Sequence, residues 1–143
     1  MIKVFLDANI YFSASRSTTG GSSVIIELVK QKKLSLFATR QIIKEAKRNL
    51  EEKESLAVNL RFYNLLNELE PKIVSIGKSE AEKNFKNLIN IKGSLVLEGA
   101  RRAKVKYLVT LDKKHFFTKQ VKEATLPFKI ITPGDLIRKL AQK

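Results

Sequence analysis

A short apolar run near the start of the chain, ending in an acid, constrains the fold more than any other feature. The run Ile2–Leu6 reads IKVFL and is followed at once by Asp7, Ala8 and Asn9. A nearly continuous apolar run of this length is typical of a strand buried on both faces, as in a parallel sheet. Ligands of such sheets bind beyond the carboxyl ends of the strands. Asp7 is therefore a candidate metal ligand, although an Asp after a strand is also often a turn former or helix cap.

The remainder of the chain alternates between strand-like and helix-like patterns. Further strands are predicted at 34–38, 72–76, 107–111 and 129–132, and helices at 23–32, 40–53, 55–70, 79–88, 93–103 and from Thr132 onward. The polar stretch Ser13–Ser23 is expected to be a loop, and it lacks the spacing of a P-loop. This alternation predicts a single α/β domain over 1–143, with three α/β/α layers around a parallel sheet of about five short strands and right-handed crossovers.

Composition limits the chemistry and the partners. The sequence has no cysteine, so it has no disulfide, thiolate metal site or cysteine nucleophile. Lys and Arg number 28 against 14 Asp and Glu, giving a net charge of +14, and residues 101–143 hold twelve of these bases but only three acids. Such a charge predicts a polyanionic partner, most simply nucleic acid, although a solubilising surface or a thermophilic composition would look similar. No run reaches membrane-spanning length, so we expect a soluble cytoplasmic protein with no membrane partner.

Two more acids extend the pattern that Asp7 begins. Asp112 follows the strand-like run Tyr107–Leu111, and Glu45 lies on the flank of the helix predicted at 40–53, where it could alternatively pair with Arg48. Carboxylates together with water suit Mg²⁺ or Mn²⁺, which bind oxygen ligands and engage phosphates. The single histidine, His115, excludes mechanisms that need two imidazoles, and no GxSxG sequence supports a Ser-His-Asp triad. The residues therefore favour a carboxylate metal site.

The segments IKVFLDAN, TRQIIKEAKRNL, KGSLVLEGARRAKVKYLVTLDKKHF and IITPGDLI, taken in this order, resemble a PIN domain over nearly the whole chain. The most specific part is YLVTLDKKHF together with an N-terminal strand that ends in Asp. The resemblance implies a PIN-like fold and a metal-dependent ribonuclease, of the kind found as toxins in VapBC toxin–antitoxin pairs. It places the metal ligands at Asp7, Glu45 and Asp112, the metal being Mg²⁺ or Mn²⁺. It also implies RNA and an antitoxin protein as partners. A homodimer is a further candidate assembly, which the sequence leaves open.

The chain departs from the PIN pattern at one position. The family usually has a further aspartate at the start of the helix before the fourth strand, where this sequence has Gly93. Glu98 lies too far along the helix to replace it, whereas Ser94 could bind a metal-bound water. The alternative hypothesis is therefore a catalytically impaired or inactive PIN-like protein that binds nucleic acid or a protein partner.

Other residues are expected to support this site. Asn9 and Thr110 are predicted to form hydrogen bonds behind the metal-binding carboxylates. A phosphate-facing basic surface is predicted from six residues of the third segment quoted above, namely Arg101, Arg102, Lys104, Lys106, Lys113 and Lys114.

Overall fold

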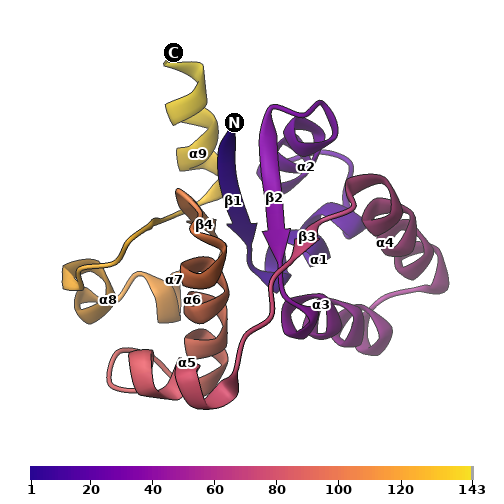
Figure 1. Ribbon diagram of the computed structural model, residues 1–143. Coiled ribbons are helices and arrows are strands. Elements are labelled where there is room, and N and C mark those ends of the chain that lie inside the picture. The colour runs from indigo at the N-terminus through magenta and orange to yellow at the C-terminus, as the bar shows by residue number, and fades with distance from the viewer. Residues whose placement is uncertain (143) are drawn as a thin grey trace.

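A computed structural model describes residues 1–142, and within them five parallel strands form one sheet in the order β3-β2-β1-β4-β5 (Figure 1). The strands are β1 (Ile2–Leu6), β2 (Leu34–Ala38), β3 (Lys72–Ile73), β4 (Tyr107–Val109) and β5 (Lys129–Ile131). The longer helices are α1 (Ala8–Arg16), α2 (Gly21–Lys30), α3 (Arg40–Lys53), α4 (Leu56–Leu69), α5 (Lys78–Phe85), α6 (Ile91–Ala103) and α9 (Pro133–Ala141). Two short helices, α7 (Lys113–Phe116) and α8 (Lys119–Glu123), lie between β4 and β5.

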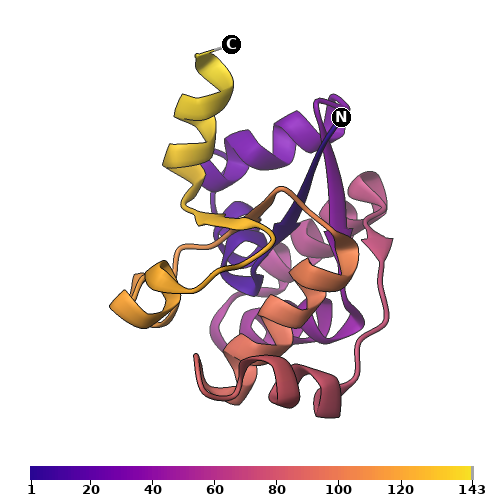
Figure 2. The ribbon, with the colours of Figure 1, turned by 60° about the vertical axis from the view of Figure 1, so that its left-hand side comes forward.

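The strand order explains how the helices are distributed. The chain moves from β1 to β2 to β3 in one direction, and then returns across the sheet to β4 and β5. Because crossovers between parallel strands are right-handed, the first four helices and the α5–α6 pair cover opposite faces. In Figure 1, α3 and α4 accordingly lie to the right of the strands, and α5 to α8 lie to the left. The last helix, α9, packs against α2, as Figure 2 also shows.

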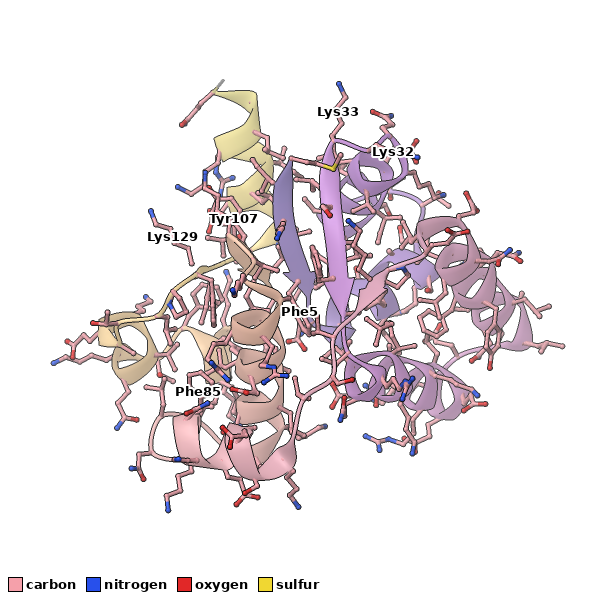
Figure 3. The ribbon with its side chains drawn as sticks, in the orientation of Figure 1. Phe5, Lys32, Lys33, Phe85, Tyr107 and Lys129 are labelled. Carbon is pink, nitrogen blue, oxygen red and sulfur yellow. The ribbon has the colours of Figure 1, made fainter. Side chains whose placement is uncertain are left out.

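The strand β1 lies in the middle of the sheet and carries the core. Phe5 and Leu6 pair in register with Leu108 and Val109 of β4, and all four are fully buried. A Cβ atom at Gly99 of α6 would lie 2.7 Å from the ring of Phe5, which is at the centre of Figure 3. The absence of a side chain at Gly99 therefore lets α6 pack close to the sheet.

The predicted loop at Ser13–Ser23 is wrong over much of its length. Helix α1 begins at Ala8 directly after Asp7 and continues to Arg16, so only the residues between Arg16 and Gly21 connect it to α2. The serine-rich sequence is compatible with a helix because the Ser15 hydroxyl donates a 2.8 Å hydrogen bond to the carbonyl oxygen of Tyr11, one turn earlier. This bond lets a buried serine occupy a helix interior.

The third strand is shorter than predicted. The sequence favours a strand over 72–76, but β3 ends at Ile73, followed by one more hydrogen bond from Val74 N–H to the carbonyl oxygen of Ala38. It is the edge strand beside β2, and both of its residues are exposed. An edge strand has one pairing neighbour and little burial to extend it, so pairing stops early.

The predicted fold class is confirmed, with helices on both faces of a five-stranded parallel sheet. None of the helices within residues 1–142 is long and apolar enough to cross a membrane.

Candidate metal and phosphodiester site

The strand order places Asp7 and Asp112 at neighbouring positions. Asp7 follows β1 and Asp112 follows β4, and these two strands are adjacent and parallel. From β1 the chain continues to β2 and β3 on one side of β1, and it then crosses back to β4 and β5 on the other side. The direction in which strands are added to the sheet therefore reverses between β1 and β4. This reversal is the point at which open α/β sheets bind their ligands.

Asp7 is held rigidly by residues from both strand ends. Its Oδ1 accepts a 2.8 Å hydrogen bond from the N–H of Ala8, and its Oδ2 accepts bonds from the Thr110 hydroxyl (2.7 Å) and from Asn9 Nδ2 (3.1 Å). Thr110 Oγ1 in turn accepts the N–H of Asp112 at 3.0 Å, and Asn9 Oδ1 accepts the N–H of Leu111 at 3.1 Å. Asn9 and Thr110 therefore link the ends of β1 and β4 and fix the orientation of the Asp7 carboxylate.

Asp112 has a local role as well as a position at the site. Its Oδ1 accepts the N–H of His115 at 3.1 Å, which caps α7, and its Oδ2 lies 2.9 Å from His115 Nδ1. Asp7 similarly caps α1. Each acid thus caps the helix that follows its strand. For Asp7, helix capping is the structural alternative to metal binding that the sequence also suggested.

Glu45 reaches the same region from α3. Its side chain is 21% exposed, and its Oε1 lies 3.0 Å from Nζ of Lys92, which is at the start of α6. The alternative pairing with Arg48 is not among the ion pairs of residues 1–142, so Glu45 pairs across to another helix instead.

These side chains border one cavity of about 200 Å³ at the carboxyl edge of the sheet. Its lining includes Asp7, Asn9, Glu45, Lys92, Asp112 and His115. Burial raises the pKa of Asp7 above its ordinary value of 3.8, the hydrogen bonds from Thr110 and Ala8 lower it, and the charges of Glu45 and Asp112 raise it again. Glu45 and Asp112 therefore both disfavour the charged form of Asp7, as like charges do.

The donor set fits a hard divalent cation in its chemistry, because it offers three carboxylates whose mutual repulsion a 2+ charge would relieve. In the arrangement described for residues 1–142, no three His, Cys, Asp or Glu side chains are close enough to hold a metal ion together. In this arrangement two of the acids have other partners, since Glu45 Oε1 lies 3.0 Å from Lys92 Nζ and Asp112 Oδ2 lies 2.9 Å from His115 Nδ1.

Gly93 also lines the cavity and is buried. A Cβ atom built on it would lie 2.3 Å from Cδ1 and 2.5 Å from Cγ1 of Ile89. Gly93 therefore borders the cavity at the position where the PIN resemblance implies an aspartate. An acidic side chain has no room there unless Ile89 moves.

Ser94 is not brought to the acidic cavity. Its side chain is fully buried, its hydroxyl has no hydrogen-bond partner among the described residues, and it lines a separate hollow beside Ile89 and Ile91. One residue further along a helix is about 100° further around it, which turns Ser94 away from the face that carries Lys92 and Gly93. The expected contact of Ser94 with a metal-bound water is not supported by this placement.

The six predicted basic residues do not share one surface. Lys113 and Lys114 are exposed on α7, directly after Asp112. Arg102, Lys104 and Lys106 lie at or beyond the end of α6 and before β4, hence at the amino edge of the sheet, where Lys32 and Lys33 also lie (Figure 3). A phosphate-facing surface at the acidic cavity can therefore include only Lys113 and Lys114 from this set.

Arg101 has a structural partner instead. Its guanidinium donates hydrogen bonds of 2.8 and 2.7 Å to the two oxygens of Glu98, which also accepts a 3.0 Å bond from Asn84 of α5. These bonds lower the pKa of the buried Glu98 carboxyl, and the bonds from Arg101 have the largest effect. The cluster joins α5 to α6.

Sequence reasoning missed Lys92 at the site. Lys92 lies next to Gly93 in the first turn of α6, and both residues line the cavity. Its position beside Gly93 was the one feature of the sequence that could have identified it as a site residue. Its partner, on α3, is 47 residues earlier in the chain, which a local pattern does not reveal.

Comparison with known proteins gives a structural likeness but no sequence family. No protein-family model and no curated protein matches the sequence. A chain from the crystal structure of VapBC2 from Rickettsia felis, bound to a DNA fragment from their promoter, has a TM-score of 0.65 and 16% identity; the match covers 92% of this chain and 98% of that one. At this level of identity the likeness defines the fold, and the chain has a PIN-like α/β fold.

Proposed function

We propose that this chain is a metal-dependent endoribonuclease that hydrolyses phosphodiester bonds of RNA with Mg²⁺ or Mn²⁺. One observation carries the proposal: carboxylates from β1, α3 and β4 line a single cavity at the point where the strand order reverses. Asp7, Asp112 and Glu45 would hold the ion, and Glu45 would also hold or orient the attacking water. A divalent cation supplies charge stabilisation at the scissile phosphate and a lowered pKa for water.

Other residues of the chain support this chemistry by orienting the Asp7 carboxylate and by providing positive charge beside the cavity. Thr110 and Asn9 fix the Asp7 carboxylate by hydrogen bonds from Oγ1 and Nδ2. Lys113 and Lys114 extend a positive surface beside the acidic cavity, which suits contacts with the RNA backbone. The net charge of +14 adds a general attraction for nucleic acid that salt would weaken.

An RNA cleavage assay tests the proposal. Wild-type protein in Mn²⁺ or Mg²⁺ is expected to cleave RNA, and EDTA is expected to abolish cleavage. Asp7→Asn is expected to be inactive while it remains folded, because an asparagine Oδ1 can still accept the N–H of Ala8. Cleavage that is unchanged in Asp7→Asn, with thermal unfolding as the check on folding, would reject the mechanism.

A binding protein without catalysis is the second candidate. It is favoured by Gly93, which leaves the cavity with three carboxylates, and by the ion pair that directs Glu45 to Lys92. This candidate predicts RNA binding that weakens with salt and no turnover in either metal. The same assay, run alongside filter binding over a range of salt concentrations, separates the two candidates.

We further propose that the chain acts as the toxin of a toxin–antitoxin pair. The VapBC2 likeness supports this, and so does a cleft of about 500 Å³ between α7–α8 and the edge strand β5. The cleft is apolar at Phe116 and Phe128 and is bordered by Lys122 and Lys139, which suits a peptide with apolar and acidic residues. Co-purification with the product of a neighbouring gene, and size-exclusion chromatography for a homodimer, test these partners.

A further inference from the structure

Lys92 occupies a particular place in the acidic cavity. It is in the first turn of α6, its Nζ lies 3.0 Å from Glu45 Oε1 on α3, and its side chain is 67% exposed. Among the described residues that line the cavity, it is the one lysine or arginine. The ion pair therefore joins two helices at the mouth of a pocket whose other charged residues are carboxylates.

Lys92 forms its ion pair with Glu45. The next residue is Gly93, which has no side chain, and Ile89 fills the space in which a side chain at position 93 would lie. The first turn of α6 therefore gives the cavity the ammonium group of Lys92 and no carboxylate. It offsets one of the three negative charges that line the cavity.

A divalent cation and Lys92 would compete for the same carboxylate. Glu45 Oε1 is engaged by Lys92 Nζ at 3.0 Å, and no three His, Cys, Asp or Glu side chains within residues 1–142 are grouped closely enough to hold a metal ion. A cation bound by all three acids would also be repelled by an ammonium ion a few ångströms away. Because Lys92 is mostly exposed, it can move into solvent without leaving a buried charge behind.

We propose that Lys92 is a positioning residue that holds Glu45 away from the other two acids and must release it when a divalent cation binds. The affinity of the site for the cation is then set in part by the ion pair, and the metal-free cavity is stabilised in an open arrangement. This inference rests on the proposed function, because it assumes that the three acids bind a metal.

Titration with Mn²⁺ in the absence of RNA tests the inference without reference to catalysis. Isothermal titration calorimetry would compare wild type with Lys92→Gln, which removes the charge, and with Lys92→Arg, which keeps it. We expect Lys92→Gln to bind Mn²⁺ on the order of tenfold more tightly and Lys92→Arg to bind as wild type does. Lys30→Gln is the matched control, because Lys30 pairs with Glu68 at 3.2 Å outside the lining of the cavity, and it is expected to change nothing.

The outcomes separate this inference from the function on which it rests. Mn²⁺ binding that Asp7→Asn abolishes, but that Lys92→Gln leaves equal or weaker, would overturn the role of Lys92 alone. Absence of Mn²⁺ binding in wild type and in all variants would overturn both proposals. Equal tightening in Lys92→Gln and Lys30→Gln would also contradict the inference, because it would reflect overall charge rather than the ion pair.

Discussion

The hydroxyl of Thr110 donates a 2.7 Å hydrogen bond to Oδ2 of Asp7, a residue that lies 103 positions earlier in the chain. The same oxygen of Thr110 accepts the N–H of Asp112 at 3.0 Å. One buried hydroxyl therefore connects the two acids that follow β1 and β4, and it couples the geometry of the site to the pairing of the two strands.

Replacement of Thr110 by valine is expected to destabilise the fold by about 1–3 kcal/mol, because the buried Asp7 carboxylate and the Asp112 N–H each lose a partner. Urea unfolding at neutral pH measures the loss. Thr125→Val is a suitable control, because Thr125 is exposed and we expect a change below about 0.5 kcal/mol there. Equal unfolding midpoints for wild type and Thr110→Val would contradict the connecting role of this hydroxyl.

The pH dependence of stability should carry a signature of Asp7. Burial raises the pKa of Asp7 in the folded state above its ordinary value of 3.8, so the folded state holds this proton more tightly than the unfolded state does. The contribution of Asp7 to stability is therefore most favourable below pH 3.8 and declines as the pH rises from there through the folded-state pKa. In metal-free buffer, thermal unfolding as a function of pH should show this decline in wild type, and a smaller decline in Asp7→Asn. A decline of the same size in both proteins would contradict the raised pKa.

Gly99 allows α6 to approach the sheet, so Gly99→Ala is expected to destabilise the protein by about 1–3 kcal/mol through overpacking. The new Cβ atom would lie 2.7 Å from the ring of Phe5 and 3.0 Å from Cγ2 of Thr39. Gly134→Ala in α9 is the matched control, because its Cβ atom would find its nearest neighbour at 3.6 Å, and the higher helix propensity of alanine should leave stability equal or better. Denaturant unfolding of both variants measures the difference in unfolding free energy between them. Equal unfolding free energies for Gly99→Ala and Gly134→Ala would show that α6 can shift to accommodate the new Cβ atom.

Gly93→Asp is expected to restore little by itself. The Cβ atom would lie 2.3 Å from Cδ1 of Ile89, so the single variant should lose about 1–3 kcal/mol of stability through overpacking. Combining it with Ile89→Ala provides space for the new side chain, and the double variant should bind Mn²⁺ more tightly than Ile89→Ala does. Calorimetric titration of both proteins checks this, and equal affinities would indicate that position 93 does not contribute a ligand.

The sequence was sufficient for the parts of the fold that repeat a simple pattern. Runs such as Ile2–Leu6 and Tyr107–Leu111 are mostly apolar because both faces of a parallel strand are covered, so the strands and the acids after them could be predicted. Right-handed crossovers then restrict the topology to few possibilities. The second half of α1 could not be predicted, because Ser13 and Ser15 favour a loop locally, whereas the helix is anchored by the buried Ile10 and Tyr11 of its first half.

The fine structure of the site depended on contacts between distant segments. Lys92 and Glu45 lie on different helices, and their pairing follows from the way α3 and α6 approach each other at the sheet edge. The direction of Ser94 depended on the rotation of α6 about its axis. The separation of Lys104 and Lys106 from Lys113 depended on which edge of the sheet each one adjoins. Neighbourhood in the sequence indicated none of these three relationships.

Anomalous diffraction from crystals grown with Mn²⁺ shows whether Asp7, Glu45 and Asp112 share one divalent cation. We predict an anomalous peak inside the cavity at coordination distance from carboxylate oxygens of these residues, with the Glu45 side chain released from Lys92. A cavity without a peak at saturating Mn²⁺, with Glu45 still paired to Lys92, would contradict the account.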